Sequence, residues 1–256
     1  MRVISNISYS DIGHPAQMLD LWLPENKEFS IFIFFHGGGL EHGSKEEKYI
    51  QELVNKGVAV VSANYRMYPS AVFPEFIRDA AAAVAWTYQN IQNYGKCSKF
   101  FVGGSSAGGY ISQMLCFDKS YLAPYGINPA NIDGFIHDAG QPTVHFNVLR
   151  ERGIDSRRII VDEAAPLYFV GKEHEYAPML FVVSDNDMEN RYEQTMLMIS
   201  TLKHFGYDQN KIELKVMQGT HCSYYNWSYE NGDNAFVTII NDYISRKSIS
   251  GEDNKK

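Results

Sequence analysis

Ser106 stands in a sequence pattern that favours nucleophilic chemistry. The run Gly104-Ser105-Ser106-Ala107-Gly108 fits G-x-S-x-G and directly follows the apolar residues 100–103. A strand that leads into a glycine-flanked serine and then into a helix raises the hydroxyl at the tip of a sharp turn. Glycine is needed beside the serine because larger side chains would crowd so tight a turn. The pattern therefore predicts an accessible serine nucleophile.

A second motif upstream carries groups suited to stabilising negative charge. His36-Gly37-Gly38-Gly39 follows the apolar run 31–35, so this motif also lies at the end of a predicted strand. In an HGGG-type loop, backbone N–H groups bind the oxyanion that forms when an acyl group is attacked. We expect the N–H groups of Gly38, Gly39 and Ala107 to form this oxyanion hole. Two such motifs at strand ends are more specific than either alone.

A serine hydroxyl needs a base within hydrogen-bond reach, and the base needs a group that orients it. With this elbow, the acid and then the histidine follow the serine along the chain. Asp187 comes just after the apolar run 180–184, and His221 comes after the last apolar run, 212–216. We therefore expect a catalytic triad of Ser106, Asp187 and His221.

These assignments have rivals close by in the sequence. Asp185 and Glu189 each stand two residues from Asp187 and compete for the role of the acid. Ser105 is the alternative nucleophile, but we expect its side chain to point away and steady the turn. The chain contains eight histidines, of which only His221 follows the last predicted strand.

Apolar runs of strand length alternate with segments of helix length. This alternation is typical of an α/β fold with a mostly parallel sheet and helices on both faces. The sequence predicts eight strands, the first two forming an antiparallel pair: 3–9, 18–23, 31–35, 59–62, 100–102, 134–137, 180–184 and 212–216. It also predicts five helices: 45–56, 76–93, 107–117, 191–205 and 234–245.

We interpret residues 1–246 as a single domain, because 256 residues suffice for one large α/β unit. Residues 138–176 separate two strands and contain Pro142 and Pro166, so we expect a loop-rich insertion that faces the substrate in place of a larger cap. Residues 247–256 are polar and charged, and we expect a disordered tail there.

Composition narrows the classes of partner. The net charge of −7, without a dense cluster of Lys or Arg, argues against nucleic acid or an anionic membrane as the main partner. No apolar run is long enough to span a bilayer. The first residues lack the apolar stretch of a signal peptide, which predicts a cytoplasmic location. The sequence carries no signal for an oligomeric state.

The three cysteines are too few and too scattered for a disulfide framework or a zinc site. We expect no metal and no cofactor, since a serine triad needs neither. Arg66 and Asp79 are charged residues in apolar surroundings, and we interpret them as structural partners because buried charges are normally paired.

Together these motifs resemble the α/β-hydrolase superfamily, and more narrowly the small bacterial carbohydrate esterases of the acetyl-xylan and feruloyl types and related HGGG-motif carboxylesterases. Further segments are similar to that group: Asp20-Leu21-Trp22-Leu23-Pro24, Gly43-Ser44-Lys45, Asn64-Tyr65-Arg66, Phe73-Pro74 and Ala165-Pro166-Leu167-Tyr168. The chain departs from it at Leu40, where many relatives have an aromatic residue, and at Ser184, where the acid loop usually opens with glycine. The resemblance implies a serine esterase that forms an acyl-enzyme.

The open site implied by a short insertion suits short acyl groups, acetyl above all, on bulky alcohols such as sugars. The aromatic residues of the stretch 224–229 after His221 either stack on a sugar or aryl group or pack locally. An arylformamidase similar to kynurenine formamidase would use the same triad and is the alternative function. A peptidase would usually bring a large extra domain. A binding protein without catalysis is the rival from another class, disfavoured because every site residue is present.

Overall fold

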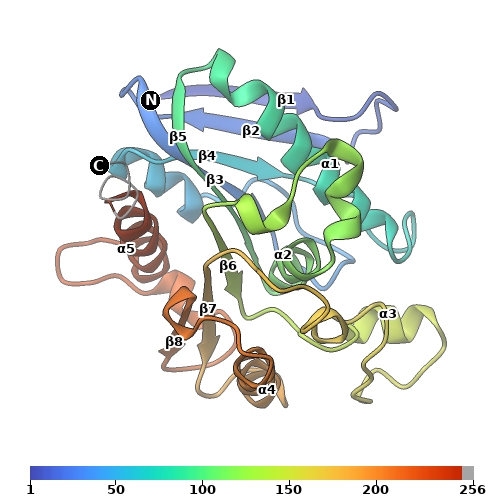
Figure 1. Cartoon of the computed structure of the whole chain (residues 1–256). Helices are drawn as coiled ribbons and strands as arrows, with labels where there is room; N and C mark the ends of the chain where they lie inside the picture. Colours follow the sequence, from blue (N-terminus) through green and yellow to red (C-terminus); the bar gives the residue numbers. More distant parts are fainter. Residues whose placement is uncertain (250–256) are drawn as a thin grey trace.

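The computed structural model describes residues 1–249. Within them eight strands form one sheet in the order β1-β2-β4-β3-β5-β6-β7-β8 (Figure 1). β1 (Arg2–Ser8) and β2 (Met18–Leu23) form the predicted antiparallel pair, and β2 also runs antiparallel to β4 (Ala59–Ala63). The other neighbours in this sheet are parallel. The predicted eight-stranded, mostly parallel α/β fold is confirmed.

The central strands alternate side chains between two buried layers. In β3 (Glu28–Phe35), Ile31 and Ile33 belong to one apolar cluster, whereas Phe32 and Phe34 belong to the other. Successive side chains in a strand point to opposite faces, so a strand buried on both faces reads as a continuous apolar run. The remaining strands are β5 (Lys96–Ser105), β6 (Gly134–Asp138), β7 (Met179–Ser184) and β8 (Ile212–Met217).

Helices cover both faces of the sheet. α1 (Glu75–Asn90), α2 (Ala107–Phe117) and α4 (Arg191–His204) contribute to one apolar cluster, while α5 (Ala235–Ile249) contributes to the other. Figure 1 shows α5 on the far side of the sheet from α1 and α2. Within residues 1–249 no helix is both long enough and apolar enough to cross a membrane.

Two segments differ from the sequence prediction. The helix expected over 45–56 is a 3-10 helix, η1 (Tyr49–Lys56), because Lys45 turns inward to form a buried ion pair with Asp20 at 2.7 Å. The insertion 138–176 contains a short helix, α3 (Phe146–Glu151), that the sequence did not predict.

The boundary of the expected disordered tail also needs correction. α5 continues to Ile249, whereas the tail was expected to begin at residue 247. Lys247 forms an ion pair with Glu213 of β8 at 3.1 Å, which ties the last turn of the helix to the sheet edge. The rest of the predicted tail, 250–256, lies outside the described residues.

The turn between β5 and α2 depends on glycines that pack against the neighbouring strand. A Cβ atom on Gly108 would lie 1.9 Å from the carbonyl oxygen of Phe35, and one on Gly104 would lie 2.6 Å from the same oxygen. Real Cβ atoms do not approach backbone so closely, so α2 can start at this point only with glycine at both positions. This close packing is what holds Ser106 at the end of the sheet.

Arg66 and Asp79 pair with each other, as we expected. The guanidinium of Arg66 donates from Nε and Nη2 to the two carboxylate oxygens of Asp79, each at 2.8 Å. Gln17 donates a further hydrogen bond to the same carboxylate at 2.7 Å. These bonds tie the loop after β4 to α1 and lie apart from Ser106, which is consistent with a structural role.

Candidate active site

Ser106, His221 and Asp187 form a continuous hydrogen-bonded chain. The Oγ atom of Ser106 lies 2.8 Å from Nε2 of His221, and Nδ1 of His221 lies 2.6 Å from Oδ1 of Asp187. The serine comes from the β5–α2 turn, the aspartate from the loop after β7 and the histidine from the loop after β8. The structure thus brings together three residues that the sequence singled out from distant positions.

Ser106 has the strained backbone expected of a nucleophile elbow. Its φ of 55° and ψ of −110° are unfavourable for a residue with a side chain, and such strain costs on the order of 1–3 kcal/mol. The N–H of Ser106 donates to the carbonyl of Asp138 at 2.8 Å, and its own carbonyl accepts from the N–H of Tyr110 at 2.9 Å. These two bonds hold the turn from both sides and direct the hydroxyl toward His221.

The Asp187 carboxylate is buried and held by backbone donors. Its side chain is 0% exposed, and it accepts hydrogen bonds from the N–H groups of Met188 at 2.7 Å and Ser184 at 3.2 Å. Burial opposes ionisation, but the bond with His221 and the two backbone bonds outweigh it and keep the pKa of Asp187 below its ordinary value. An ionised carboxylate is the form that can orient an imidazole and stabilise its cation.

The rival acids lie elsewhere. Asp185 accepts a hydrogen bond from the N–H of Gly219 at 2.9 Å, so its side chain braces the loop that carries the histidine. Glu189 is exposed and makes no hydrogen bond to His221. Of the three candidates, only Asp187 contacts the imidazole.

Ser105, the rival nucleophile, is buried and lies outside this chain of hydrogen bonds. Its side chain is 1% exposed, and its hydroxyl makes no well-formed hydrogen bond within the described residues. It nevertheless lies near the carboxyl of Asp138, where it favours the ionised form. Its side chain lies at the floor of the cavity that contains Ser106.

Gly37 and Gly38 form the wall of the cavity next to Ser106. A Cβ atom on Gly37 would lie 3.4 Å from Cβ of Ser106, so this residue packs directly on the serine. Gly38 has φ of +106°, and a Cβ atom there would lie 1.9 Å from the carbonyl oxygen of His42. The sequence named Gly38 as a donor but did not single out Gly37 beyond its place in the motif.

Gly39 takes a different place in the loop. It has φ of +65° and packs against Phe146 and Asn147 of α3, and its carbonyl accepts a hydrogen bond from the Asn147 side chain. Within residues 1–249 no hydrogen bond uses the N–H of Gly38, Gly39 or Ala107. Unused N–H groups beside a nucleophile are what an oxyanion hole requires.

His36 steadies this loop as a neutral side chain. It is fully buried and stacks on Tyr65 with ring centroids 4.5 Å apart, and its Nδ1 lies 2.7 Å from the carbonyl oxygen of Gly37. Burial lowers the pKa of His36 to about 4. Gly43 is required opposite the ring, because a Cβ atom there would lie 2.5 Å from Nδ1.

Asp138 is a site residue that the sequence analysis did not single out. It is the last residue of β6 and is completely buried. Its Oδ1 accepts a hydrogen bond from the hydroxyl of Tyr224, and its Oδ2 accepts one from the hydroxyl of Tyr225. Burial raises its pKa to about 6, although the tyrosine hydrogen bonds favour the ionised form. The only sequence signal was an acidic residue at the end of a buried strand.

The cavity that contains Ser106 and His221 has a volume of about 290 Å³. Tyr49 and Tyr225 line one side of it and stack on each other with centroids 4.9 Å apart. Of the aromatic residues after His221, Tyr224 is buried in the core, whereas Tyr225 reaches the cavity. Local packing therefore describes Tyr224, and stacking on a substrate stays a prediction for Tyr225.

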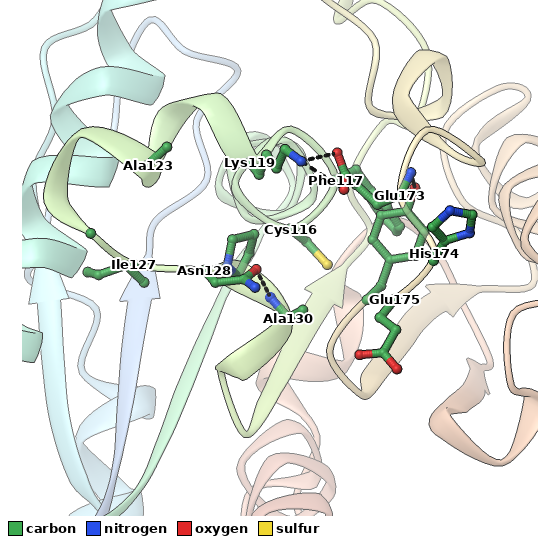
Figure 2. Close-up of a pocket in the computed structure, with 13 residues that line it drawn as sticks. Cys116, Phe117, Lys119, Ala123, Ile127, Asn128, Ala130, Glu173, His174 and Glu175 are labelled. Atoms are coloured by element: carbon green, nitrogen blue, oxygen red, sulfur yellow. Dashed lines mark hydrogen bonds and ion pairs between the residues drawn. The ribbon is translucent and has the colours of Figure 1, made fainter.

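A larger cavity of about 540 Å³ lies at the other end of α2 from Ser106. Cys116 and Phe117 from the end of that helix line it, and Lys119 and Glu173 form an ion pair beside it (Figure 2). None of the candidate triad or oxyanion residues lines this cavity. Size alone does not identify a reaction site. We therefore place the candidate active site at the smaller cavity, which contains Ser106.

Comparison with known proteins gives the family. The profile described as the prolyl oligopeptidase family matches residues 75–235, more than half of the chain. The chain belongs to the prolyl oligopeptidase family. A second profile, BD-FAE, matches residues 19–128, which include the HGGG loop and the elbow. This member of the family is an α/β-hydrolase, as its motifs predicted.

Its relatives in sequence include esterases. Esterase LipC of Mycobacterium tuberculosis is 34% identical over 215 residues, which cover 74% of this chain and 53% of LipC. Esterase LipQ of the same organism is 26% identical over 204 residues, covering 70% of this chain and 47% of LipQ. The chain thus spans about half the length of these curated relatives.

Solved structures of similar fold cover almost the whole chain. Esterase B from Lactobacillus rhamnosis superimposes with a TM-score of 0.75 at 18% identity, over 99% of this chain and 89% of that one. A truncated form of a carbohydrate esterase from gut microbiota superimposes with a TM-score of 0.76 at 17% identity, over 97% of each chain. At such low identity the likeness establishes the fold.

Proposed function

We propose that this protein is a serine carboxylesterase that hydrolyses short-acyl esters, preferably acetyl esters of sugars. The observation that carries the proposal is the relay of Ser106, His221 and Asp187, with contacts of 2.8 and 2.6 Å. A serine within hydrogen-bond reach of a histidine that is itself oriented by a buried carboxylate is the arrangement that activates a hydroxyl for acyl transfer.

In the proposed mechanism Ser106 attacks the ester carbonyl while His221 takes the hydroxyl proton. Asp187 keeps the imidazole in the required tautomer and stabilises the imidazolium that forms. The oxyanion accepts hydrogen bonds from the N–H of Ala107 and from the glycine loop, where we assign Gly38 and Gly39. His221 then protonates the leaving alcohol and later activates the water that releases the acid.

Three observations support an ester, a short acyl group and a sugar alcohol in turn. LipC and LipQ are named as esterases, and a carbohydrate esterase is among the proteins of similar fold. The cavity of about 290 Å³ opens to solvent, which suits a short acyl group on a bulky alcohol better than a long lipid chain. The stacked pair Tyr49 and Tyr225 offers an aromatic surface of the kind on which sugar rings pack.

The test is a hydrolysis panel with the wild type and Ser106→Ala side by side. It contains 4-nitrophenyl acetate, butyrate and octanoate, acetylated xylo-oligosaccharide and methyl ferulate. We expect turnover of acetyl esters to exceed that of the octanoate, and Ser106→Ala to lose at least about 10³-fold in kcat. Ser105→Ala tests the rival nucleophile and should lose far less activity than Ser106→Ala, because the neighbouring serine lies outside the relay. Equal turnover by wild type and Ser106→Ala would refute the proposal.

The same panel separates the alternative functions. N-formylkynurenine tests the arylformamidase, and glycyl-proline 4-nitroanilide tests the peptidase chemistry that the family name suggests. A kcat/KM for either amide above that for every ester would replace the esterase proposal. A stable, folded protein that turns over none of these substrates would favour the non-catalytic binding protein.

A further inference from the structure

A second polar cavity lies beside the candidate triad. It has a volume of about 290 Å³ and lies against the loop that follows Asp187, with Met188, Glu189 and Asn190 among its lining residues. It shares no lining residue with the cavity that contains Ser106. Its chemistry is set by three guanidinium groups, from Arg157, Arg158 and Arg191, against one carboxylate.

Arg191 is the buried member of this set. It is 3% exposed, and within residues 1–249 no carboxylate lies within ion-pair distance of it. Its Nη1 donates to the carbonyl of Ala139, and its Nη2 donates to Oε1 of Gln141 at 3.3 Å. A guanidinium has five N–H donors, so most of its capacity to bind a carboxylate is unused.

The other charges leave the cavity with an excess of positive charge. Arg157 is neutralised by Asp155, to which it donates from Nε and Nη2 at 3.0 and 2.6 Å. Arg158 forms no ion pair within the described residues, and Glu189 is exposed. Arg158, which is exposed like Glu189, and the buried Arg191 are therefore the two guanidinium groups of the cavity without an ion pair among the described residues, although the charge of Asp187 also acts on Arg191.

Neighbouring amides add donors to the cavity. Gln194 accepts a hydrogen bond at Oε1 from the hydroxyl of Thr143 at 2.8 Å, which leaves its NH₂ group without a partner among residues 1–249. The amide oxygen of Gln141 is occupied by the N–H of Phe146 and by Arg191. Donors thus outnumber acceptors, which suits an anion better than a neutral polyol.

Two chains of contacts within the protein relate the lining of this cavity to the nucleophile. Ala139, which accepts from Arg191, follows Asp138, whose carbonyl accepts from the N–H of Ser106. Phe146 lines the cavity and its ring also packs against Gly39 of the glycine loop, 3.5 Å from where a Cβ would stand. Phe146 therefore lies between this cavity and the glycine loop.

We infer that this cavity binds a carboxylate carried by the ester substrate several bonds from the scissile carbonyl. The inference rests on the proposed esterase function and deepens it, because it selects acidic over neutral esters. The carboxylate comes either from the alcohol, as in an acetylated uronic acid, or from a dicarboxylic acyl group. In both cases it would be held by Arg158, Arg191 and the NH₂ group of Gln194.

The experiment compares esters that differ only in the carboxylate. For the alcohol side, 4-acetoxybenzoate is compared with its methyl ester, and for the acyl side, mono-4-nitrophenyl adipate with 4-nitrophenyl hexanoate. We expect kcat/KM for one acidic ester to exceed that of its neutral partner by about tenfold, mostly through KM. Arg158→Gln should lower this ratio several-fold, and about 0.5 M NaCl should lower it in the wild type.

Arg152→Gln is the matched control, because it removes the same charge from the same segment but pairs with Asp162 outside the cavity. Equal ratios for the acidic and neutral esters in both pairs would overturn the inference. An equal fall of the ratio in Arg152→Gln and Arg158→Gln would also overturn it, since only the general field of the protein would then be acting.

A binding titration separates this inference from the proposed function. The Ser106→Ala protein and the double variant Ser106→Ala/Arg158→Gln are each titrated calorimetrically with 4-acetoxybenzoate and with mono-methyl adipate. Binding that is weakened several-fold by Arg158→Gln supports the cavity even if no ester is hydrolysed. Absence of binding to Ser106→Ala, with the wild type active on neutral esters, overturns the cavity and leaves the esterase intact.

Discussion

The N–H of Ser106 donates a hydrogen bond to the carbonyl of Asp138 at 2.8 Å, so the end of β6 supports the backbone of the candidate nucleophile. The side chain of the same aspartate accepts from Tyr224 and Tyr225, which follow His221 by three and four residues. Asp138 thereby links the turn that carries the serine to the segment that carries the histidine. A single buried residue holds the two reacting groups in register.

This link predicts that Asp138→Asn lowers kcat/KM for 4-nitrophenyl acetate by about tenfold at neutral pH, since an amide can accept only one of the two tyrosine hydrogen bonds at its oxygen. The pKa of Asp138 is raised to about 6 by burial. Below that pH the wild-type carboxyl is protonated and resembles the amide, and above it the carboxylate accepts both bonds.

The ratio of wild-type to Asp138→Asn activity should therefore increase as the pH rises through about 6 and then level off. The measurement is kcat/KM for both proteins at intervals from about pH 5 to about pH 8. A ratio that does not change with pH would mean that the charge of Asp138 has no part in positioning.

The two neighbouring aspartates of the acid loop should behave differently. Asp187→Asn replaces the carboxylate that orients His221 by a neutral amide and should reduce kcat by about 10²- to 10⁴-fold, less than Ser106→Ala does. Asp185→Asn keeps an amide oxygen that accepts from the N–H of Gly219 and should cost less than about tenfold. Steady-state kinetics of the two variants decide between them, and a larger loss for Asp185→Asn would reassign the acid.

Replacing an elbow glycine by alanine tests stability, because helix propensity and close packing predict opposite effects. Replacing a helical glycine by alanine normally favours the helix by about 1 kcal/mol. Gly108→Ala should instead destabilise the protein by about 3 kcal/mol or prevent folding, because the new Cβ would meet the Phe35 carbonyl at 1.9 Å. Urea unfolding monitored by circular dichroism measures the change.

Gly126→Ala is the control for this substitution. Nothing lies within 4 Å of a Cβ at that position, and its φ of +71° should cost only about 1 kcal/mol. Equal stability of the Gly108→Ala protein and the wild type would show that β3 and α2 do not pack as closely as described.

Tyr225 should contribute to the binding of bulky alcohols. Tyr225→Ala removes the ring that stacks on Tyr49 and should raise KM for acetylated xylo-oligosaccharide about tenfold, but KM for 4-nitrophenyl acetate much less. It also removes the hydrogen bond to Asp138, so kcat should fall for both substrates alike. Tyr229→Ala, an exposed tyrosine outside the cavity, should leave both values near those of the wild type. A parallel rise of KM for both substrates in Tyr225→Ala would argue against a sugar-binding surface.

Much of the fold follows from local patterns. The alternation of apolar strands and helices predicts the sheet, and α2 is predicted at Ala107–Phe117, where the structure has it. Predicted helix ends are less accurate where a contact with a distant part of the chain holds the terminal residue. Lys45 does not begin a helix, because its ammonium group forms an ion pair with Asp20, on a strand that is distant in sequence.

The amino-acid sequence alone specifies the motifs whose chemistry is local. The glycines around Ser106 and the HGGG loop are contiguous, and a tight turn restricts residue types within a few positions. Their position directly after apolar runs is enough to assign both motifs to strand ends. The chain order of serine, acid and histidine likewise points to His221.

The packing of the folded chain determines which side chains meet when residue spacing along the sequence does not. Asp185 and Asp187 share one loop and differ only in which one faces His221, which depends on how β7 and β8 pair. Asp138 becomes a site residue only because the strand order places β6 beside β5 and because Tyr224 and Tyr225 fold over its carboxyl. Contacts between residues far apart in the chain arise from packing of the whole sheet, so no local pattern records them.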